Sequence, residues 1–176
     1  MFEDIINSLS KQFEIGKVDI QDNRLCFITV SKEQTISLIT FLKNLAGYKH
    51  LVLLTAVDYI EQGEFQLTYL LNNPEFKIDL GVRTRIAREP ATMDSAHHLW
   101  PTIATYQREL KEMFGIDFPG SPRVDEPFIL EGWVGIPPYR RDFDTKAFAQ
   151  DFYHQRSERE NNDPATYMKE KLYPNE

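Results

Sequence analysis

The side chains that could bind a metal ion are few in this chain. Of its four histidines, His97 and His98 are adjacent. On a helix they would point about 100° apart, so they could not bind one ion in the usual i, i+4 arrangement. His50 and His154 each stand apart from the other histidines and from the single cysteine. We therefore predict no metal site, and we interpret the paired histidines as solvated side chains.

Cysteine chemistry is limited to one residue, Cys26, in the strand-like stretch RLCFITV. One cysteine forms no internal disulfide and cannot supply the four thiolates of an iron–sulfur or structural zinc site. A free cysteine usually packs as a small hydrophobic side chain. We predict a buried, structural Cys26 and no bound cofactor.

Sequence patterns of common catalytic sites are missing as well. The chain contains no G-x-S-x-G elbow, no phosphate-binding P-loop and no G-x-G-x-x-G dinucleotide pattern. The prediction is therefore a chain without its own catalytic site. The competing hypothesis is a small free-standing enzyme that uses His97 or His98 together with nearby acidic residues.

Composition favours one globular domain. The chain has 176 residues, of which 41% are hydrophobic and 27% charged, and no apolar run approaches the ~20 residues of a membrane span. Its net charge of −7 opposes binding to nucleic acid or anionic lipid. The N-terminal residues lack the features of a secretory signal, so we expect an intracellular protein.

Hydrophobic periodicity predicts the elements of the first half. Apolar residues at three- and four-residue spacing predict a helix over 2–13, and the stretches 17–20 and 24–30 flank a turn and predict a hairpin. A second helix is expected over 32–46, with Ser31 and Gln34 as a capping box and Gly47 as its stop.

Three strands and two helices are predicted next. Residues 50–60 are apolar on both faces, which indicates a strand at the centre of the sheet. The stretches 64–71 and 76–86 alternate apolar and polar residues, which predicts half-buried strands in a meander with the first. Helices are expected over 92–100, stopped by Pro101, and over 102–114.

Together these elements predict an α+β fold. It has two layers, with a mixed or antiparallel sheet of about five strands, covered by helices on one face in the order helix, hairpin, helix, meander, helix. An extended C-terminal loop and tail follow. We expect one domain over residues 1–143 and a polar extension over 144–176, which either forms a surface helix or orders on a partner.

The most distinctive segment follows the last predicted helix. We expect Arg108 and Glu112 to form an exposed i, i+4 ion pair, Gly115 to end the helix, and Phe118 to be exposed in a Gly- and Pro-rich loop. A stiff loop loses little entropy on binding, and Arg140 and Arg141 are suited to interface carboxylates. We predict that the loop over 115–143 is a docking surface.

Two stretches within this region carry a family resemblance. RELKEMFGIDFPGSP, over 108–122, and WVGIPPYRRD, over 133–142, resemble the signature of the C subunit of NADH:quinone oxidoreductase, or respiratory complex I. The sequence departs from that signature at Gln107, at Ser121 and at the run Val124-Asp125-Glu126, which is acidic where the family is basic. The resemblance assigns to a partner interface Arg108, Glu109, Gly115, Phe118, Gly120, Pro122, Trp133, Gly135, Pro137, Arg140, Arg141 and Asp142.

The resemblance implies a hydrophilic, cofactor-free subunit. It would dock on the large quinone-site subunit in the peripheral arm, beside iron–sulfur subunits, and support electron transfer to quinone. It would lie at the cytoplasmic face of the membrane, which it would reach only through the complex. Two alternatives remain: the equivalent subunit of a membrane-bound nickel–iron hydrogenase-type or related dehydrogenase complex, and a stand-alone adaptor that binds peptides through the loop.

Overall fold

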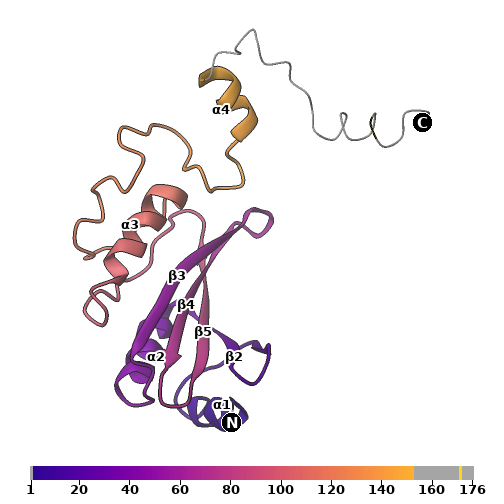
Figure 1. Cartoon of the computed structure of the whole chain (residues 1–176), viewed down its shortest axis with the longest axis vertical. Helices are drawn as coiled ribbons and strands as arrows, with labels where there is room; N and C mark the ends of the chain where they lie inside the picture. The colour runs from indigo at the N-terminus through magenta and orange to yellow at the C-terminus, as the bar shows by residue number, and fades with distance from the viewer. Residues whose placement is uncertain (1, 153–170, 172–176) are drawn as a thin grey trace. The chain divides into compact units, whose positions relative to one another are not determined.

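A five-stranded sheet carries the fold in this computed structural model, which describes residues 2–152 and residue 171 (Figure 1). The strand order is β1-β2-β5-β4-β3. β2 and β5 are parallel and the other neighbouring pairs are antiparallel, so the predicted hairpin, meander and mixed sheet are confirmed. The strands are β1 (Val18–Ile20), β2 (Leu25–Val30), β3 (His50–Tyr59), β4 (Glu64–Asn73) and β5 (Ile78–Ala87).

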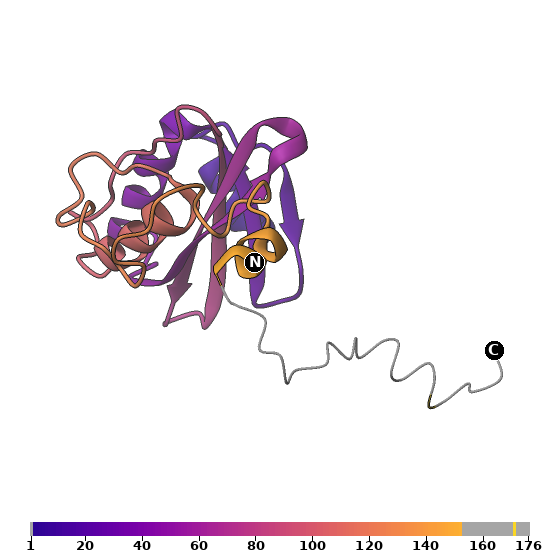
Figure 2. The same ribbon diagram turned by 90° about the horizontal axis from the view of Figure 1, so that it is seen from above.

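Helices form the second layer on one face of this sheet (Figure 2). Phe65 of β4 makes an edge-to-face contact with Phe114 of α3 at 5.9 Å. Asn73 lies on the same face of β4 and donates to the carbonyl of Ala46, just after α2, at 3.1 Å. The expected α+β architecture is confirmed. The helices are α1 (Phe2–Leu9), α2 (Lys32–Asn44), the short 3₁₀ helix η1 (Ile60–Gln62), α3 (Ile103–Phe114) and α4 (Thr145–Phe152).

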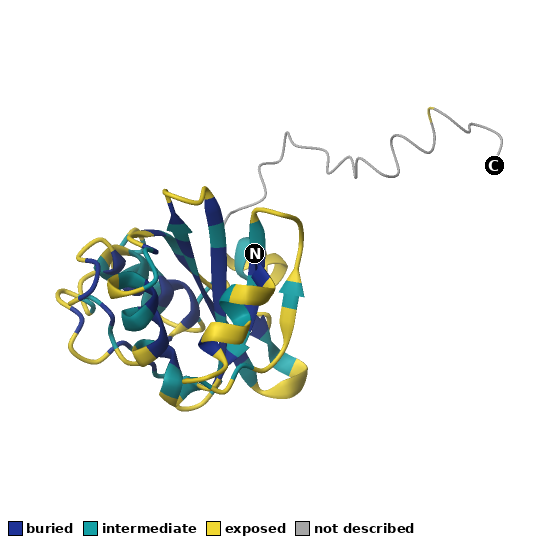
Figure 3. Cartoon of the chain, turned by 90° about the horizontal axis from the view of Figure 1, so that it is seen from below, coloured by how far each residue is buried: buried dark blue, intermediate teal, exposed yellow. Residues whose placement is uncertain are grey.

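Alternating side chains on the strands build the core. Along β4, Phe65, Leu67, Tyr69 and Leu71 are fully buried, and the paired positions of β5 continue the same face. In Figure 3 buried residues follow the strands, whereas exposed residues gather on the turns. Burial of this apolar face is the main driving force for the fold.

The predicted central position of β3 is wrong, because β3 is an edge strand of the sheet. Its pairing with β4 shifts register between Leu51 and Leu53. Such a bulge reverses the alternation, so that Leu51 and Leu54 both face the core although their positions differ in parity. The apolar residues on both parities therefore reflect the bulge, and Val57 on the other face is exposed.

The predicted helix over 92–100 is also wrong, since this stretch has only a turn near its end. Its backbone pairs with the segment after α3: Met93 donates to the carbonyl of Asp117 at 3.0 Å, and Asp117 donates to that of Ala91 at 2.9 Å. The hydroxyl of Ser95 accepts from the backbone of His97 at 3.2 Å. These bonds replace those of a helix.

The first two helices are shorter than predicted. α1 ends at Leu9, and the chain turns so that Phe13 packs on Phe41 at 5.7 Å. α2 begins as expected but makes no side-chain cap at Ser31. Gln34 instead accepts a hydrogen bond from the backbone of Glu14 at 3.0 Å, so the predicted capping box is wrong.

The chain divides into two units, Met1–Phe143 and Asp144–Glu176. The first holds the sheet and the helices that cover it. Within the second, α4 begins where Asp144 accepts from the backbone of Ala147 at 2.9 Å. Most of the predicted polar extension lies outside the described residues. Among residues 2–152 and 171, no helix has the length and apolar character needed to cross a membrane.

Candidate protein-binding interface

The end of α3 sets the path of the predicted docking segment. Gly115 has a φ of 79°, in the left-handed region, and its N–H donates to the carbonyls of Leu110 and Lys111, which confirms the predicted helix stop. A side chain at this position would also approach the ring of Pro137, at 3.3 Å from the added carbon. Glycine therefore lets the returning chain pass close to the helix end.

Phe118 is not an exposed contact residue, because its side chain is fully buried. The neighbouring Ile116 is buried too, and the backbone between them pairs with residues 91–93. This pairing turns residues 116–118 toward the core. The predicted exposure of Phe118 is wrong, since an apolar side chain between two backbone hydrogen-bonded segments packs inward.

Glu112 holds the loop instead of forming an ion pair on the helix surface. Its carboxylate accepts hydrogen bonds from the backbone N–H groups of Phe128, Ile129 and Leu130, at 2.5, 2.8 and 2.9 Å. Burial alone would raise the pKa of Glu112, but these three donors outweigh it and lower the pKa below its usual value. The expected Arg108–Glu112 ion pair is absent from the contacts of the described residues.

The other charged residues of α3 also turn toward the loop. Arg108 lies 4.0 Å from the carboxylate of Glu126, and its guanidinium lies over the ring of Phe128 at 5.4 Å. Lys111 bonds to Asp117 at 2.7 Å and to Asp125. The acidic residues at 125 and 126 are thus neutralised within the chain, by cations of α3 and by Arg123 at 2.6 Å from Glu126.

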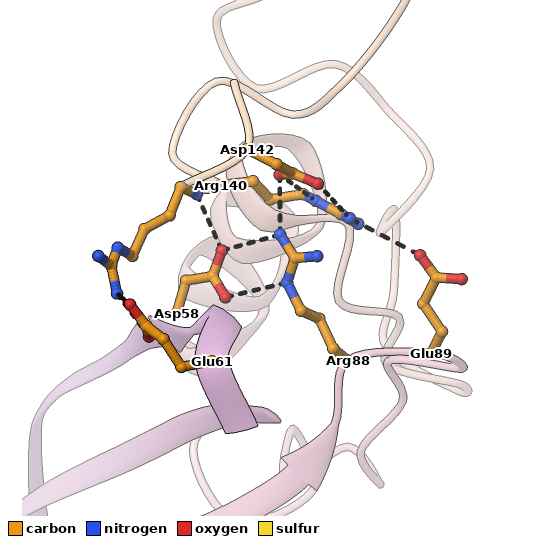
Figure 4. A network of polar contacts seen from close by, with 7 residues as sticks. Asp58, Glu61, Arg88, Glu89, Arg140 and Asp142 are labelled. Atoms are coloured by element: carbon orange, nitrogen blue, oxygen red, sulfur yellow. Dashed lines mark hydrogen bonds and ion pairs between the residues drawn. The ribbon is translucent and has the colours of Figure 1, made fainter. Parts of the chain in front are cut away.

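A second set of contacts fastens the far end of the loop to the sheet (Figure 4). Asp58 of β3 is buried and receives two hydrogen bonds from Arg88, just after β5, at 3.0 and 3.1 Å. The hydrogen bonds to Asp58 are the first cause that raises the pKa of Arg88. A buried carboxylate needs such a partner, because an unpaired charge there is costly.

Arg140 and Asp142 join this pair. Arg140 donates to both carboxylate oxygens of Asp142, at 3.1 and 3.0 Å, and Arg88 lies 2.8 Å from the same carboxylate. Figure 4 shows Asp142 between the two guanidinium groups. The hydrogen bonds from Arg140, followed by those from Arg88, hold the pKa of Asp142 well below its usual range. Arg140 is mostly buried, with 15% of its side chain exposed.

Arg141 differs from its neighbour. Its backbone N–H donates to Asp58 at 2.9 Å, while its guanidinium pairs with Glu61 at 2.8 Å. More than half of both side chains is exposed, at 55% for Arg141 and 58% for Glu61. Exposed pairs of this kind stabilise a fold little. Arg141 therefore anchors the loop through its backbone and keeps its side chain at the surface.

The remaining predicted interface residues are dispersed along the loop. Trp133 is half-buried against Phe143, with ring centres 5.6 Å apart, and its indole N–H donates to the carbonyl of Ile136 at 3.2 Å. Glu109 and Pro137 are half-buried, and the others are exposed: Gly120, Pro122 and Gly135. These residues do not converge on one polar pocket.

Several important residues escaped the sequence prediction. Asp58 and Arg88 fasten the loop, and the signal for Asp58 was an acidic residue within the apolar run HLVLLTAVDYI. The large exposed apolar side chains of the loop lie between the signature positions, and no periodicity marks them. They are Ile129, Val134, Ile136 and Tyr139.

The histidines considered for chemistry lie apart from this region in the contacts observed. His97 is half-buried and His98 is exposed. Within the described residues, no group of three or more His, Cys, Asp or Glu side chains could hold a metal ion. Cys26 is buried on β2, as predicted.

Comparisons with known proteins identify relatives of this fold and loop. The C subunit of the NADH-quinone oxidoreductase of Moorella thermoacetica is 31% identical over 116 residues, which are 66% of this chain and 78% of the relative. The C/D subunit of the same enzyme of Pseudomonas fluorescens is 28% identical over 82% of this chain and 26% of that longer protein.

A solved structure is similar over nearly the whole chain. It is a chain of the membrane-bound sulfane sulfur reductase, an archaeal respiratory membrane complex, with a TM-score of 0.82, 26% identity, and coverage of 92% of this chain and 97% of that one. The model of the family described as "Respiratory-chain NADH dehydrogenase, 30 Kd subunit" matches residues 28–149. Because this match spans more than half of the sequence, the chain belongs to the 30 kDa subunit family of respiratory-chain NADH dehydrogenase.

Proposed function

We propose that this chain is a non-catalytic, hydrophilic subunit of a membrane-associated NADH:quinone oxidoreductase-like complex. Family membership is the observation that carries the proposal, because the matched relatives are subunits named for that enzyme. The chain supports electron transfer to quinone by assembly, and neighbouring subunits perform the redox chemistry. Its own contribution is a folded surface.

The proposed docking surface is the region from α3 to Asp142. It contains the signature residues, and it is fastened to the sheet by Glu112 and by the Asp58–Arg88 pair. A prefolded loop loses less conformational entropy on binding than a flexible one. Within this surface, Trp133 and Arg140 hold the loop, while Gly120, Pro122 and Gly135 shape its exposed turns.

The proposed partner is the large quinone-site subunit, with iron–sulfur subunits nearby. The C/D relatives support this partner, since in them a region similar to this chain is part of a longer protein named for both subunits. The chain would then lie in the peripheral arm at the cytoplasmic face, and contact the membrane only through the complex.

Co-expression tests this proposal. The full chain would be produced together with the large D-type subunit of the same organism, with an affinity tag on the D-type subunit, and the complex purified under mild conditions. We expect stable co-elution of the two subunits. Recovery of the chain alone, or turnover of NADH and quinone by the purified chain alone, would contradict the proposal.

A second candidate is the equivalent subunit of a related complex with another electron acceptor. The similarity to the sulfane sulfur reductase, with a TM-score of 0.82, favours it. Purification of the whole complex through a tag on this chain separates the candidates. NADH-dependent quinone reduction supports the first, whereas reduction of sulfane sulfur without NADH:quinone activity supports the second.

A further inference from the structure

The part of the docking surface that lies over α3 is a closed loop, residues 128–139, which we call the anchored loop. Its first residues bond to the carboxylate of Glu112. At its other end, Tyr139 donates to the carbonyl of Met113 at 2.9 Å. Both ends are therefore tied to consecutive residues of one helix, which is the arrangement of an Ω-loop.

Turns inside the anchored loop fix its shape. Trp133 donates its backbone N–H to Leu130 at 3.1 Å and its indole N–H to the carbonyl of Ile136. Its ring packs on Phe143. Gly132, with a φ of 75°, provides the left-handed residue that one of these turns requires. The indole thus fills the interior of the loop and leaves other side chains outside.

The outer side chains of the loop are large and apolar. The exposed fraction is 67% for Ile129, 93% for Val134, 44% for Ile136 and 58% for Tyr139. We call these four residues the apolar tip. Four such side chains on one rigid loop are unusual for a free surface and typical of a contact site.

We infer that the apolar tip, rather than the arginine pair, makes the main contact with the partner subunit, and that it occupies an uncharged apolar depression there. This inference rests on the proposed function. Arg140 is already bound to Asp142, and Arg141 to Glu61, so both guanidinium groups have partners within the chain. An apolar tip gains free energy when another protein removes it from water.

Charge argues for a protein rather than a lipid surface as the occupant. The stretch 123–139 contains Asp125, Glu126 and Glu131 against a single basic residue, Arg123, and the whole chain has a net charge of −7. Peripheral insertion into anionic membranes relies on basic side chains around the apolar ones. The tip lacks that surrounding and fits a protein depression.

The test uses the full chain and the large D-type subunit of the same organism as the probe. The affinity of the wild type would be compared with that of a Val134→Ser/Ile136→Ser variant. Leu45→Ser/Phe76→Ser is the matched control, because it removes two exposed apolar side chains outside the loop, at 75% and 58% exposure. Thermal unfolding of all three proteins checks that the fold is kept.

We expect the tip variant to bind at least about 30-fold more weakly, which corresponds to about 2 kcal/mol, the loss typical of a hot spot. The control should bind like the wild type. If the wild type binds the D-type subunit and the tip variant binds equally well, the inference is wrong while the proposed function stands. If the wild type does not bind at all, the proposed function fails.

Two further measurements on the free chain test the choice of occupant. Sedimentation with phosphatidylglycerol-containing vesicles should leave the wild type in solution, and light scattering should give a monomer. Vesicle binding or self-association that the Val134→Ser/Ile136→Ser variant abolishes would overturn the inference, since either result would assign the tip to a different occupant.

Discussion

The sheet layer and the segment after α3 are stabilised in different ways. In the sheet, side chains such as Leu67, Leu71 and Val82 are fully buried, and the apolar core needs few specific polar contacts. The segment from Gly115 to Phe143 has little regular structure and is held by a few anchors, chiefly Glu112 and Asp58. A loop can thus be rigid without a core of its own, provided that charged groups bind its backbone.

This difference also separates the roles of the signature residues. Phe118 and Gly115 belong to the body, one as a core side chain and the other as a helix stop. Arg140 and Asp142 form the fastening network at the end of the loop. The exposed apolar tip lies between these positions. Residues that define the family by sequence therefore build the surface, and their neighbours present it.

The largest effect is expected from the buried acid. Asp58→Ala would leave Arg88 without its main partner and release the backbone of Arg141, so we expect a loss of about 3 kcal/mol in the free energy of unfolding. Urea unfolding measures it. Glu61→Ala is the matched control, because its ion pair is exposed and should contribute at most about 0.5 kcal/mol. Equal effects of the two substitutions would remove the distinction between buried and exposed anchors.

A smaller and local effect is expected at Glu112. Glu112→Gln keeps the shape but removes the charge that accepts three backbone hydrogen bonds, so the loop should open more easily by about 1–2 kcal/mol. Amide hydrogen exchange of residues 128–130 should become faster, while amides of β4 keep their protection. A uniform change across the sheet would instead assign Glu112 to global stability.

Acid should loosen the anchors before it unfolds the core. Asp142 and Glu112 have lowered pKa values in the fold, so the stability that they contribute is present above about pH 5 and is lost as pH falls further. Urea unfolding at several pH values measures this, and an Asp142→Asn variant should lose less stability than the wild type between about pH 5 and pH 3. The same acid dependence in both proteins would contradict the role of Asp142.

The smallest effect on the isolated fold is expected from Arg141→Ala. The guanidinium lies in an exposed pair, and the backbone contact to Asp58 remains, so the change in unfolding free energy should stay within about 0.5 kcal/mol. Thermal unfolding checks this value. Our sequence-based prediction also assigned Arg141 to assembly, and binding to the D-type subunit measures that part separately. A large loss of stability would place its side chain in the fastening network.

Much of the fold follows from local sequence patterns. Alternation predicted β4 and β5, and the turn between 20 and 25 predicted the hairpin, because each pattern is satisfied within one sheet. The edge position of β3 did not follow, since a bulge changes parity without a sequence mark. The stretch 92–100 also failed, because its hydrogen bonds go to residues beyond α3 and not to its own neighbours.

The candidate interface was predictable in location but not in detail. Glycine and proline marked a loop after Phe114, and Arg140 next to Asp142 suggested charged contacts. Their partners Arg88 and Asp58 come from strands far away in sequence, so no local pattern could pair them. The exposure of Val134 likewise depends on where Trp133 packs, which only the folded loop determines.

Both proposals depend on a loop that is already folded before any partner binds, and hydrogen exchange on the isolated full chain measures this property. We expect clear protection of the amides of Ile129, Leu130 and Tyr139, because these donate to Glu112 and Met113. Exchange of these amides at the rate of an unstructured peptide would show that the loop is not folded in the free chain.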